Sequence, residues 1–233
     1  MSKKIGVIVF PGSNCDHDAY HAMKHVMNAE TVFLWHKDTD LQGVDLVLVP
    51  GGFSYGDYLR SGAIARFSPI MEVVKEFAEK GGPVLGICNG FQILLEAGLL
   101  PGAMLHNEKL RFVCKNVFIR VESTRSLYTR GLKKGQVLDL PVSHGEGNYF
   151  IDQEGLQQLE ENNQIAFRYC NSEGERTPEA NFNGSVSAIA GITNVEGNVL
   201  GMMPHPERAM ESVLGSTDGI PFFESVLTSL QTA

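Results

Sequence analysis

Short apolar segments alternate with helical patterns through the first half of this 233-residue chain. The apolar segments are residues 4–10, 31–35, 46–49 and 84–87, and the helical patterns are residues 16–28, 69–80 and 89–97. Continuous apolar strands that alternate with helices are typical of a parallel sheet covered on both faces. The sequence therefore predicts an α/β fold with a mostly parallel central sheet and helices on both faces.

The second half of the chain is richer in strand patterns. Strands are expected at residues 112–121, 137–142, 165–169, 187–193 and 199–203, with a closing helix at 222–230. We expect these strands to form a small antiparallel extension of the same sheet, within one domain spanning residues 1–233. The stretch 154–163 is weakly patterned and supplies no evidence for either kind of element.

Charge and composition exclude several classes of partner. The formal net charge is -8, and no basic stripe is visible, which argues against a nucleic-acid partner and against an anionic membrane surface. No run approaches the ~20 apolar residues of a membrane span. The first apolar run is stopped by a Pro-Gly pair at 11–12, too early for a signal peptide. We therefore expect a cytoplasmic protein whose four scattered cysteines are reduced.

One of the four cysteines has the sequence context of a nucleophile. Cys88 lies in Gly-Ile-Cys-Asn-Gly at residues 86–90, which matches the G-x-S-x-G elbow with cysteine in place of serine. An apolar strand precedes it and a helix follows it, as an elbow requires. The positive end of that helix favours the thiolate. A free cysteine is more often a small buried hydrophobe, but the two glycines and the strand–turn–helix context favour the nucleophile.

His205 and Glu207 are the expected partners of this nucleophile. They lie in Met-Pro-His-Pro-Glu after an apolar strand, where active sites of parallel sheets collect. In an extended backbone the two side chains point the same way, so Glu207 can orient the imidazole while its other nitrogen faces the sulfur. The alternative is a rigid proline-rich loop with an exposed histidine, which the pairing with the elbow disfavours.

The remaining histidines give weaker indications of a function than His205 does. His17, His21 and His25 are spaced four residues apart on an expected helix, and such a face could hold a metal. No cysteine or carboxylate pair completes a site, so a solvated helix face is favoured and no metal is predicted. His144 lies in the glycine-rich turn Ser-His-Gly-Glu-Gly at 143–147, which could present backbone groups to a ligand.

Two backbone N–H groups are needed to hold an oxyanion beside the nucleophile. One is expected from Asn89, the residue after Cys88, and the other from Gly52 in the Pro-Gly-Gly-Phe loop that follows the third strand. No G-x-x-x-x-G-K-[ST] and no G-x-G-x-x-G after a strand are present. If the reaction uses ATP, we expect a different protein chain to bind it.

In these features the chain resembles the class I, triad-type glutamine amidotransferases, which have a flavodoxin-like fold. The likeness rests on the Gly-Gly loop, the G-x-C-x-G elbow and His-Pro-Glu, in that order. Within that family it is most similar to the glutaminase subunits of phosphoribosylformylglycinamidine synthases of the small, separate-subunit type. The segments that carry this likeness are residues 10–15, 51–60, 86–92 and 143–147.

The resemblance implies a catalytic triad of Cys88, His205 and Glu207 that hydrolyses glutamine to glutamate and ammonia. It implies an oxyanion hole at Gly52 and Asn89. Glutamine contacts are implied at Gln92, His144, Gly145 and Glu146. It further implies that a large synthetase subunit binds ATP and Mg, that a small third subunit bridges the two, and that this chain binds no cofactor.

Two other functions are compatible with part of the pattern. A stand-alone cysteine hydrolase or peptidase on a similar sheet explains the elbow but not the His-Pro-Glu segment. A non-enzymatic interaction module with a vestigial elbow is disfavoured because all three catalytic groups are present.

Overall fold

A computed structural model describes residues 3–232 of the chain. The main sheet consists of β1 (Lys4–Val9), β2 (Glu30–Trp35), β3 (Leu46–Val49), β4 (Val84–Ile87), β6 (Val113–Val121), β7 (Val137–His144), β9 (Ile165–Cys170), β10 (Ile189–Thr193) and β11 (Val199–Met202). A separate antiparallel pair is formed by β5 (Ala103–Leu105) and β8 (Asn148–Phe150). The α-helices are α1 (Asp16–His21), α2 (Pro69–Glu79), α3 (Asn89–Glu96), α4 (Gln153–Glu161) and α5 (Gly219–Thr232).

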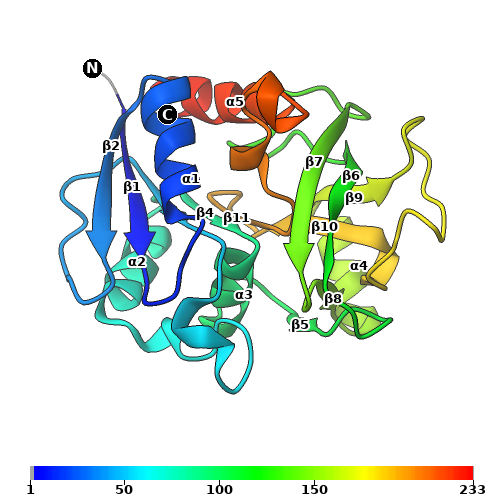
Figure 1. The fold of residues 1–233 in the computed structure, drawn as a ribbon, viewed down its shortest axis with the longest axis horizontal. Helices are drawn as coiled ribbons and strands as arrows, with labels where there is room; N and C mark the ends of the chain where they lie inside the picture. The colour runs from blue at the N-terminus through cyan, green and yellow to red at the C-terminus, as the bar shows by residue number, and fades with distance from the viewer. Residues whose placement is uncertain (1–2, 233) are drawn as a thin grey trace.

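The strands of the main sheet lie in the order β2-β1-β3-β4-β11-β10-β9-β6-β7 (Figure 1). The first five strands of this order pair in parallel, and the other four continue the sheet in antiparallel pairs. The α/β class and the parallel core are confirmed, and the antiparallel part is larger than the sequence suggested. One sheet spans both halves of the chain, which is consistent with a single domain.

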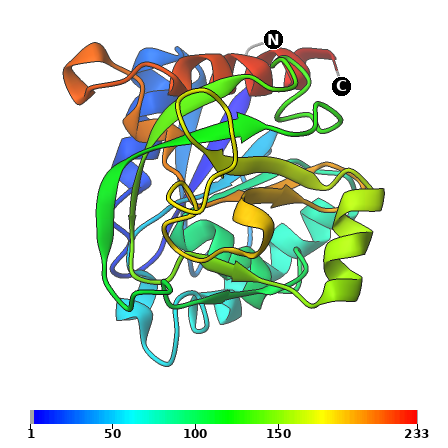
Figure 2. The ribbon, with the colours of Figure 1, turned by 90° about the vertical axis from the view of Figure 1, so that its right-hand side faces the viewer.

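Helices cover both faces of the sheet. In Figure 2 α1 and α5 lie above it, and α2 and α3 lie below it. The central strands β3 and β4 are buried at every position, as their uninterrupted apolar sequences require. On β11, Gly201 leaves room for the ring of Phe91 from α3, which a β-carbon there would overlap. Close packing of this kind sets the distance between α3 and the sheet.

Several expected elements differ in detail. The helix expected at 16–28 is an α-helix only to His21 and continues as a π-helical turn at Ala22–Val26. The weakly patterned stretch 154–163 forms α4, which begins because the carboxylate of Asp152 accepts the Gly155 N–H at 2.8 Å. The short β5 and β8 were not expected from the pattern.

The carboxyl ends of β1, β3, β4 and β11 meet at one edge of the sheet, because these strands are parallel. The loops that follow them carry the Pro-Gly-Ser-Asn, Gly-Gly, elbow and His-Pro-Glu segments. Four segments far apart in sequence therefore meet at the position where open α/β sheets bind ligands. Among residues 3–232, no helix is long and apolar enough to cross a membrane.

Candidate active site

Cys88 stands on a strained turn between β4 and α3. Its backbone angles are φ 51° and ψ −108°, a combination that residues with a side chain rarely adopt. Two glycines make the turn possible. A β-carbon on Gly90 would overlap the carbonyl oxygen of Val49, and one on Gly86 would lie 2.8 Å from the Gly90 carbonyl. The structure thus has the strand–turn–helix geometry expected of a nucleophile elbow.

His205 reaches this elbow because β11 is the parallel neighbour of β4. The register places Met202 beside Ile87, so the segments after the two strands leave the sheet next to each other. The N–H of His205 donates to the carbonyl of Pro141 in β7 at 2.8 Å. The histidine backbone is therefore held between the parallel and antiparallel parts of the sheet.

His205 and Glu207 form a buried dyad. Nδ1 of His205 lies 2.6 Å from Oε1 of Glu207, and each side chain is only 1% exposed. A tight 3₁₀ turn at Pro206–Arg208 brings the two together, and not the extended backbone that the sequence suggested. A β-carbon on Gly51 would lie 2.8 Å from Cε1 of His205 and 3.3 Å from Cβ of Cys88. The imidazole of His205 and the side chain of Cys88 therefore flank the same glycine.

The electrostatics of the dyad favour a protonated imidazole. Burial opposes the charge on His205, but the Glu207 carboxylate, together with the sulfur of Cys88 and its hydrogen bond, outweighs burial and raises the pKa of His205 to about 10. Nε2 of His205 is buried and has no hydrogen-bond partner among the described residues. It is therefore available to the sulfur of Cys88.

The residues expected to form the oxyanion hole lie on either side of Cys88. Gly52 borders the same cavity as Cys88 and has φ +126°, and a β-carbon there would lie 2.6 Å from the backbone nitrogen of Asn14. Asn89 is the first residue of α3, where N–H groups have no partner within the helix. Its side chain accepts the Ser54 N–H at 3.1 Å, which ties the Gly-Gly loop to the elbow.

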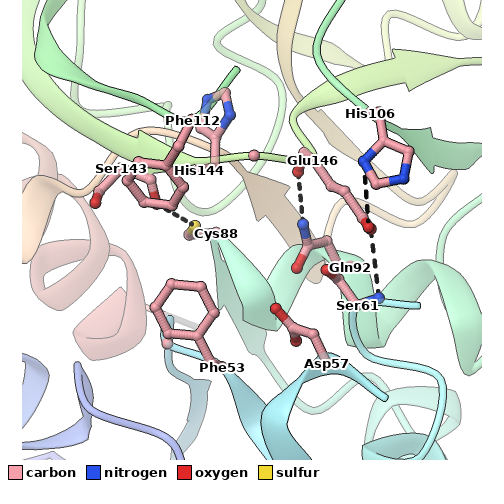
Figure 3. Close-up of a pocket in the computed structure, with 12 residues that line it drawn as sticks. Phe53, Asp57, Ser61, Cys88, Gln92, His106, Phe112, Ser143, His144 and Glu146 are labelled. Atoms are coloured by element: carbon pink, nitrogen blue, oxygen red, sulfur yellow. Dashed lines mark hydrogen bonds and ion pairs between the residues drawn. The ribbon is translucent and has the colours of Figure 1, made fainter. Parts of the chain in front are cut away.

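A cavity of about 150 Å³ opens above Cys88 (Figure 3). Four residues expected to contact substrate border it: Gln92, His144, Gly145 and Glu146. Nε2 of Gln92 donates to the Glu146 carbonyl at 2.6 Å, so α3 and the glycine-rich turn are joined across the cavity. The sulfur of Cys88 lies 3.7 Å from the carbonyl oxygen of Ser143. The cavity is of a size that suits a small molecule, and polar side chains line one side of it.

Asp57 and Glu146 give that side a negative character. Burial and the nearby Glu146 charge raise the pKa of Asp57 to about 6, although bonds from Ser61 and Asn89 oppose the shift. The carboxylate of Glu146 accepts the Ser61 N–H at 3.3 Å and lies 3.5 Å from Nδ1 of His106. Two carboxylates beside the cavity match the cationic α-amino group of an amino acid.

The imidazole ring of His144 is fixed in place beside the cavity by hydrogen bonding. Its Nδ1 lies 3.0 Å from Oδ1 of Asn107, whose amide donates to the His144 carbonyl at 2.9 Å. Burial and the nearby His205 lower the pKa of His144 to about 4, so the ring is neutral at neutral pH. Asn107 also accepts the Gly147 N–H at 3.1 Å. These bonds fix the backbone of the turn, and the side chain itself is turned away from Cys88 in Figure 3.

Cys15 lies beside the dyad. Its sulfur, His205 and Glu207 offer ligand atoms within 4.8 Å of one another. Nη2 of Arg208 lies 3.0 Å from this sulfur, so a cationic side chain already occupies the neighbourhood. Burial, and then the charge of Glu207, raise the pKa of Cys15 well above its usual range and keep the thiol protonated. A protonated thiol next to a guanidinium is poorly suited to a metal.

The histidines of α1, His17 and His21, and His25 of the π-helical turn after it do not gather. His17 bonds to Asp16 at 3.0 Å and His21 bonds to Glu211 at 2.9 Å. The ring of His25 lies 5.4 Å from that of His21, and its contact with Tyr20 is edge-on. In the described part of the chain these rings form no cluster with metal-binding spacing.

Several cavity residues escaped the sequence argument: Phe53, Asp57, Ser61, His106 and Phe112. Asp57 and Ser61 follow the Gly-Gly loop, and Phe53 is part of it, but their spacing carries no chemical signal. His106 and Phe112 lie in the connection between β5 and β6. Only the folded chain brings this connection over the elbow.

Comparison with known proteins agrees with this geometry. Residues 2–219 match the model of the CobB/CobQ-like glutamine amidotransferase domain. The phosphoribosylformylglycinamidine synthase subunit PurQ of Salinibacter ruber is 60% identical over 97% of both chains. The same subunit of Moorella thermoacetica is 58% identical over 96% of this chain and 95% of the relative.

Solved structures show the same relationship. A chain in the structure of PurLQS from Thermotoga maritima superposes with a TM-score of 0.86 at 42% identity, covering 99% of this chain and 100% of that one. A putative GMP synthase subunit from Thermoplasma acidophilum has a TM-score of 0.65 at 13% identity, which shows the fold alone. With the elbow, the dyad and the cavity in place, the chain belongs to the CobB/CobQ-like glutamine amidotransferase family.

Proposed function

We propose that the chain is the glutaminase subunit of a phosphoribosylformylglycinamidine synthase in purine biosynthesis. The observation that carries the proposal is the strained Cys88 beside the buried His205–Glu207 dyad at the floor of an acidic cavity. The likeness to PurQ subunits over nearly the whole chain supports the choice of synthase.

The proposed reaction begins with attack of the Cys88 thiolate on the side-chain amide carbonyl of glutamine. Gly52 and Asn89 donate their N–H groups to the oxyanion. His205 then protonates the leaving ammonia, a role that its raised pKa supports, because the ring carries a proton at neutral pH. The product of this half-reaction is a γ-glutamyl thioester on Cys88.

The second half-reaction uses the same histidine as a base. Once the sulfur is acylated, the negative charge beside His205 is gone and the ring has given up its proton. Neutral His205 takes a proton from water, which attacks the thioester and releases glutamate. Glu207 stays ionised, orients the ring through Nδ1 and stabilises each imidazolium.

Asp57 and Glu146 are proposed to receive the α-amino group of glutamine. They border the cavity with Gln92, whose bond to the Glu146 carbonyl fixes the wall. Gly145 and the His144 backbone complete this wall. A primary amide lacking the amino group would leave both carboxylates without a cation, which predicts selectivity for an amino-acid amide.

The proposed partners are a large synthetase subunit and a small bridging subunit, and the similarity to a chain of PurLQS supports them. ATP and Mg are assigned to the synthetase, and this chain is proposed to bind no cofactor. Ammonia that escapes into water is protonated and lost as a nucleophile, which is the physical reason to couple the subunits. A cytoplasmic location is part of the same proposal.

The test compares two nitrogen sources in the reconstituted complex. Glutamine should support synthesis with the wild-type subunit, and ammonium should support it with or without an active subunit. A subunit that hydrolyses glutamine at the same rate alone and in the complex, with no product formed from glutamine, would contradict the assignment and favour a stand-alone hydrolase.

A further inference from the structure

The Gly-Gly loop, here residues 51–57, forms one side of the substrate cavity. Gly52, Phe53 and Asp57 border the cavity. In Figure 3 the side chains of Phe53 and Asp57 lie across the cavity from Ser143. The loop therefore carries both the proposed oxyanion donor, Gly52, and a proposed partner of the substrate amino group, Asp57.

The backbone of this loop is held in an unfavourable conformation. Tyr55, Gly56 and Asp57 are consecutive and all have a positive φ, of 55°, 67° and 53°. Residues with a side chain rarely adopt this left-handed region, and they stay in it only where the surrounding structure holds them there. The loop therefore needs an anchor.

Backbone contacts next to Gly52 are long. The N–H of Phe53 donates to the carbonyl of Gly12 at 3.3 Å, and Oγ of Ser13 donates to the carbonyl of Gly51 at 3.4 Å. Three residues further on, the N–H of Tyr55 donates to the carbonyl of Pro11 at only 2.6 Å. The firm attachment of the loop is therefore at Tyr55.

The side chain of Tyr55 adds a buried anchor. Its hydroxyl lies 2.7 Å from Nδ1 of His36, just after β2, and 2.9 Å from Oγ of Ser68. His36 is 4% exposed and Ser68 is 3% exposed. Burial, followed by the charge of Lys37, lowers the pKa of His36, so the ring is neutral at neutral pH and Nδ1 can accept the phenol hydrogen.

Ser68 does not play the role that its position predicts. It immediately precedes α2, where a serine hydroxyl commonly accepts a backbone N–H of the first turn. Here the N–H of Ile70 donates to the carbonyl of His36 at 3.2 Å. The N–H of Met71 donates to the backbone carbonyl of Ser68 at 2.8 Å. The Ser68 hydroxyl makes no capping bond, and it bonds to Tyr55 instead.

We propose that Tyr55 is a positioning residue for the glutaminase reaction. Its hydroxyl, held by His36 and Ser68, keeps the Gly-Gly loop in its strained shape, and that shape aims the Gly52 N–H at the oxyanion. The inference rests on the proposed function, because it names what aligns the proposed oxyanion hole. Tyr55 is not among the residues that line the cavity, so it acts through the loop.

Loss of this anchor should affect kcat more than KM. Without it the loop can relax from its left-handed shape, and the Gly52 N–H moves away from the developing charge. Removal of an entire oxyanion donor costs about 10²–10³ in kcat, so a displaced donor should cost at least about fivefold. Asp57 is also held by Nδ2 of Asn89, at 3.2 Å. Binding of the amino group, and with it KM, should therefore change by less than about twofold.

Four variants and one control test this inference. Tyr55→Phe keeps the ring and removes the hydroxyl. His36→Leu removes the acceptor, whereas His36→Asn keeps a polar atom near the position of Nδ1. Ser68→Ala removes the second contact. Asp152→Ala is the control, because Asp152 caps α4 through the Gly155 N–H and α4 does not border the cavity.

The measurements are kcat and KM for glutamate release by the synthetase complex, the rate at which iodoacetamide alkylates Cys88, and the thermal midpoint of each variant. We expect Tyr55→Phe and His36→Leu to lower kcat at least about fivefold with an unchanged alkylation rate, because the elbow keeps its own contacts. His36→Asn should retain most of the wild-type kcat. Ser68→Ala and Asp152→Ala should each lower the thermal midpoint by about 2–4 °C, but only Ser68→Ala should lower kcat.

Three results would overturn the inference. One is wild-type kcat in the folded Tyr55→Phe variant. Another is a loss of kcat in Tyr55→Phe that is matched by an equal loss of Cys88 alkylation, which would mean that the change distorts the elbow. The third is an equal loss in His36→Asn and His36→Leu. If the wild-type complex releases no glutamate, the proposed function fails, whereas an active wild type with unaffected variants refutes only the positioning role.

Discussion

Replacing Glu207 by glutamine tests the dyad most directly. The change keeps the size of the side chain and removes the carboxylate that lies 2.6 Å from Nδ1 of His205 in a site closed to water. A hydrogen bond to a charged group contributes about 1.5–3 kcal/mol. If that is the stabilisation lost from the transition state, the rate falls about 10- to 150-fold.

The loss should be smaller than that of His205→Ala. In the proposed mechanism Glu207 orients the ring and stabilises its charge, whereas His205 moves the proton in both half-reactions. Loss of a general acid and base costs on the order of 10²–10⁴-fold, and the alanine variant also loses the positioned cation. We expect Glu207→Gln to retain measurable hydrolysis and His205→Ala to retain almost none.

The pH dependence gives a second, independent readout. The Glu207 carboxylate is the leading cause that raises the pKa of His205 to about 10, whereas burial alone lowers it. Without that carboxylate the imidazolium form, which is proposed to protonate ammonia, is lost at a lower pH. The alkaline limb of kcat/KM should therefore move to lower pH in Glu207→Gln.

The assay is glutamate release by the synthetase complex across pH, with iodoacetamide labelling of Cys88 as a check of the thiolate. Glu196→Gln, an exposed carboxylate in the turn before β11, is the control. Equal and complete loss in the folded Glu207→Gln and His205→Ala variants would refute the division of roles. So would an alkaline limb that does not move.

Four further changes have defined outcomes. Cys88→Ala should abolish glutamine-dependent synthesis while ammonium-dependent synthesis persists, and glutamine-dependent product from the variant would exclude the nucleophile. Asp57→Asn should raise KM for glutamine more than it lowers kcat, and wild-type KM should rise as pH falls below about 6, where Asp57 takes up a proton. Gly90→Ala should lower the free energy of unfolding in urea by more than about 3 kcal/mol, because its β-carbon meets a backbone carbonyl, whereas Gly81→Ala, with open space, should cost only about 1 kcal/mol. Cys15→Ala should lower kcat about tenfold and Cys15→Ser should restore part of it, whereas full activity in the alanine variant would show that the thiol beside the dyad is dispensable.

Local sequence chemistry was enough to predict the elbow, the dyad and the parallel part of the sheet. The spacing of glycines around Cys88 is required by the turn itself, so it is visible in five consecutive residues. Uninterrupted apolar strands between helices specify burial on both faces, and therefore the parallel pairing of β1, β3 and β4. These features depend on residues that are neighbours in the sequence, so the sequence alone is enough to predict them.

Tertiary structure alone decided how the second half is arranged. The sequence indicated strands, but the order β11-β10-β9-β6-β7 depends on pairings such as Val113 with His144, which are far apart in the chain. The helix α4 formed in a stretch with little periodicity because of its cap at Asp152 and one buried residue, Leu159. Contacts of this kind depend on what packs against a segment. The hydrophobic pattern of the segment itself does not contain that information.

The same division holds within the site. The residues proposed to do the chemistry were visible in the sequence because chemistry restricts their types and spacing. The residues that surround them were not: Asp57 obtains its raised pKa from burial and Glu146, 89 positions away, and Cys15 meets Arg208 across 193 positions. Charge, burial and cavities arise from the meeting of distant segments, so only the folded chain could place them around Cys88, His205 and Glu207.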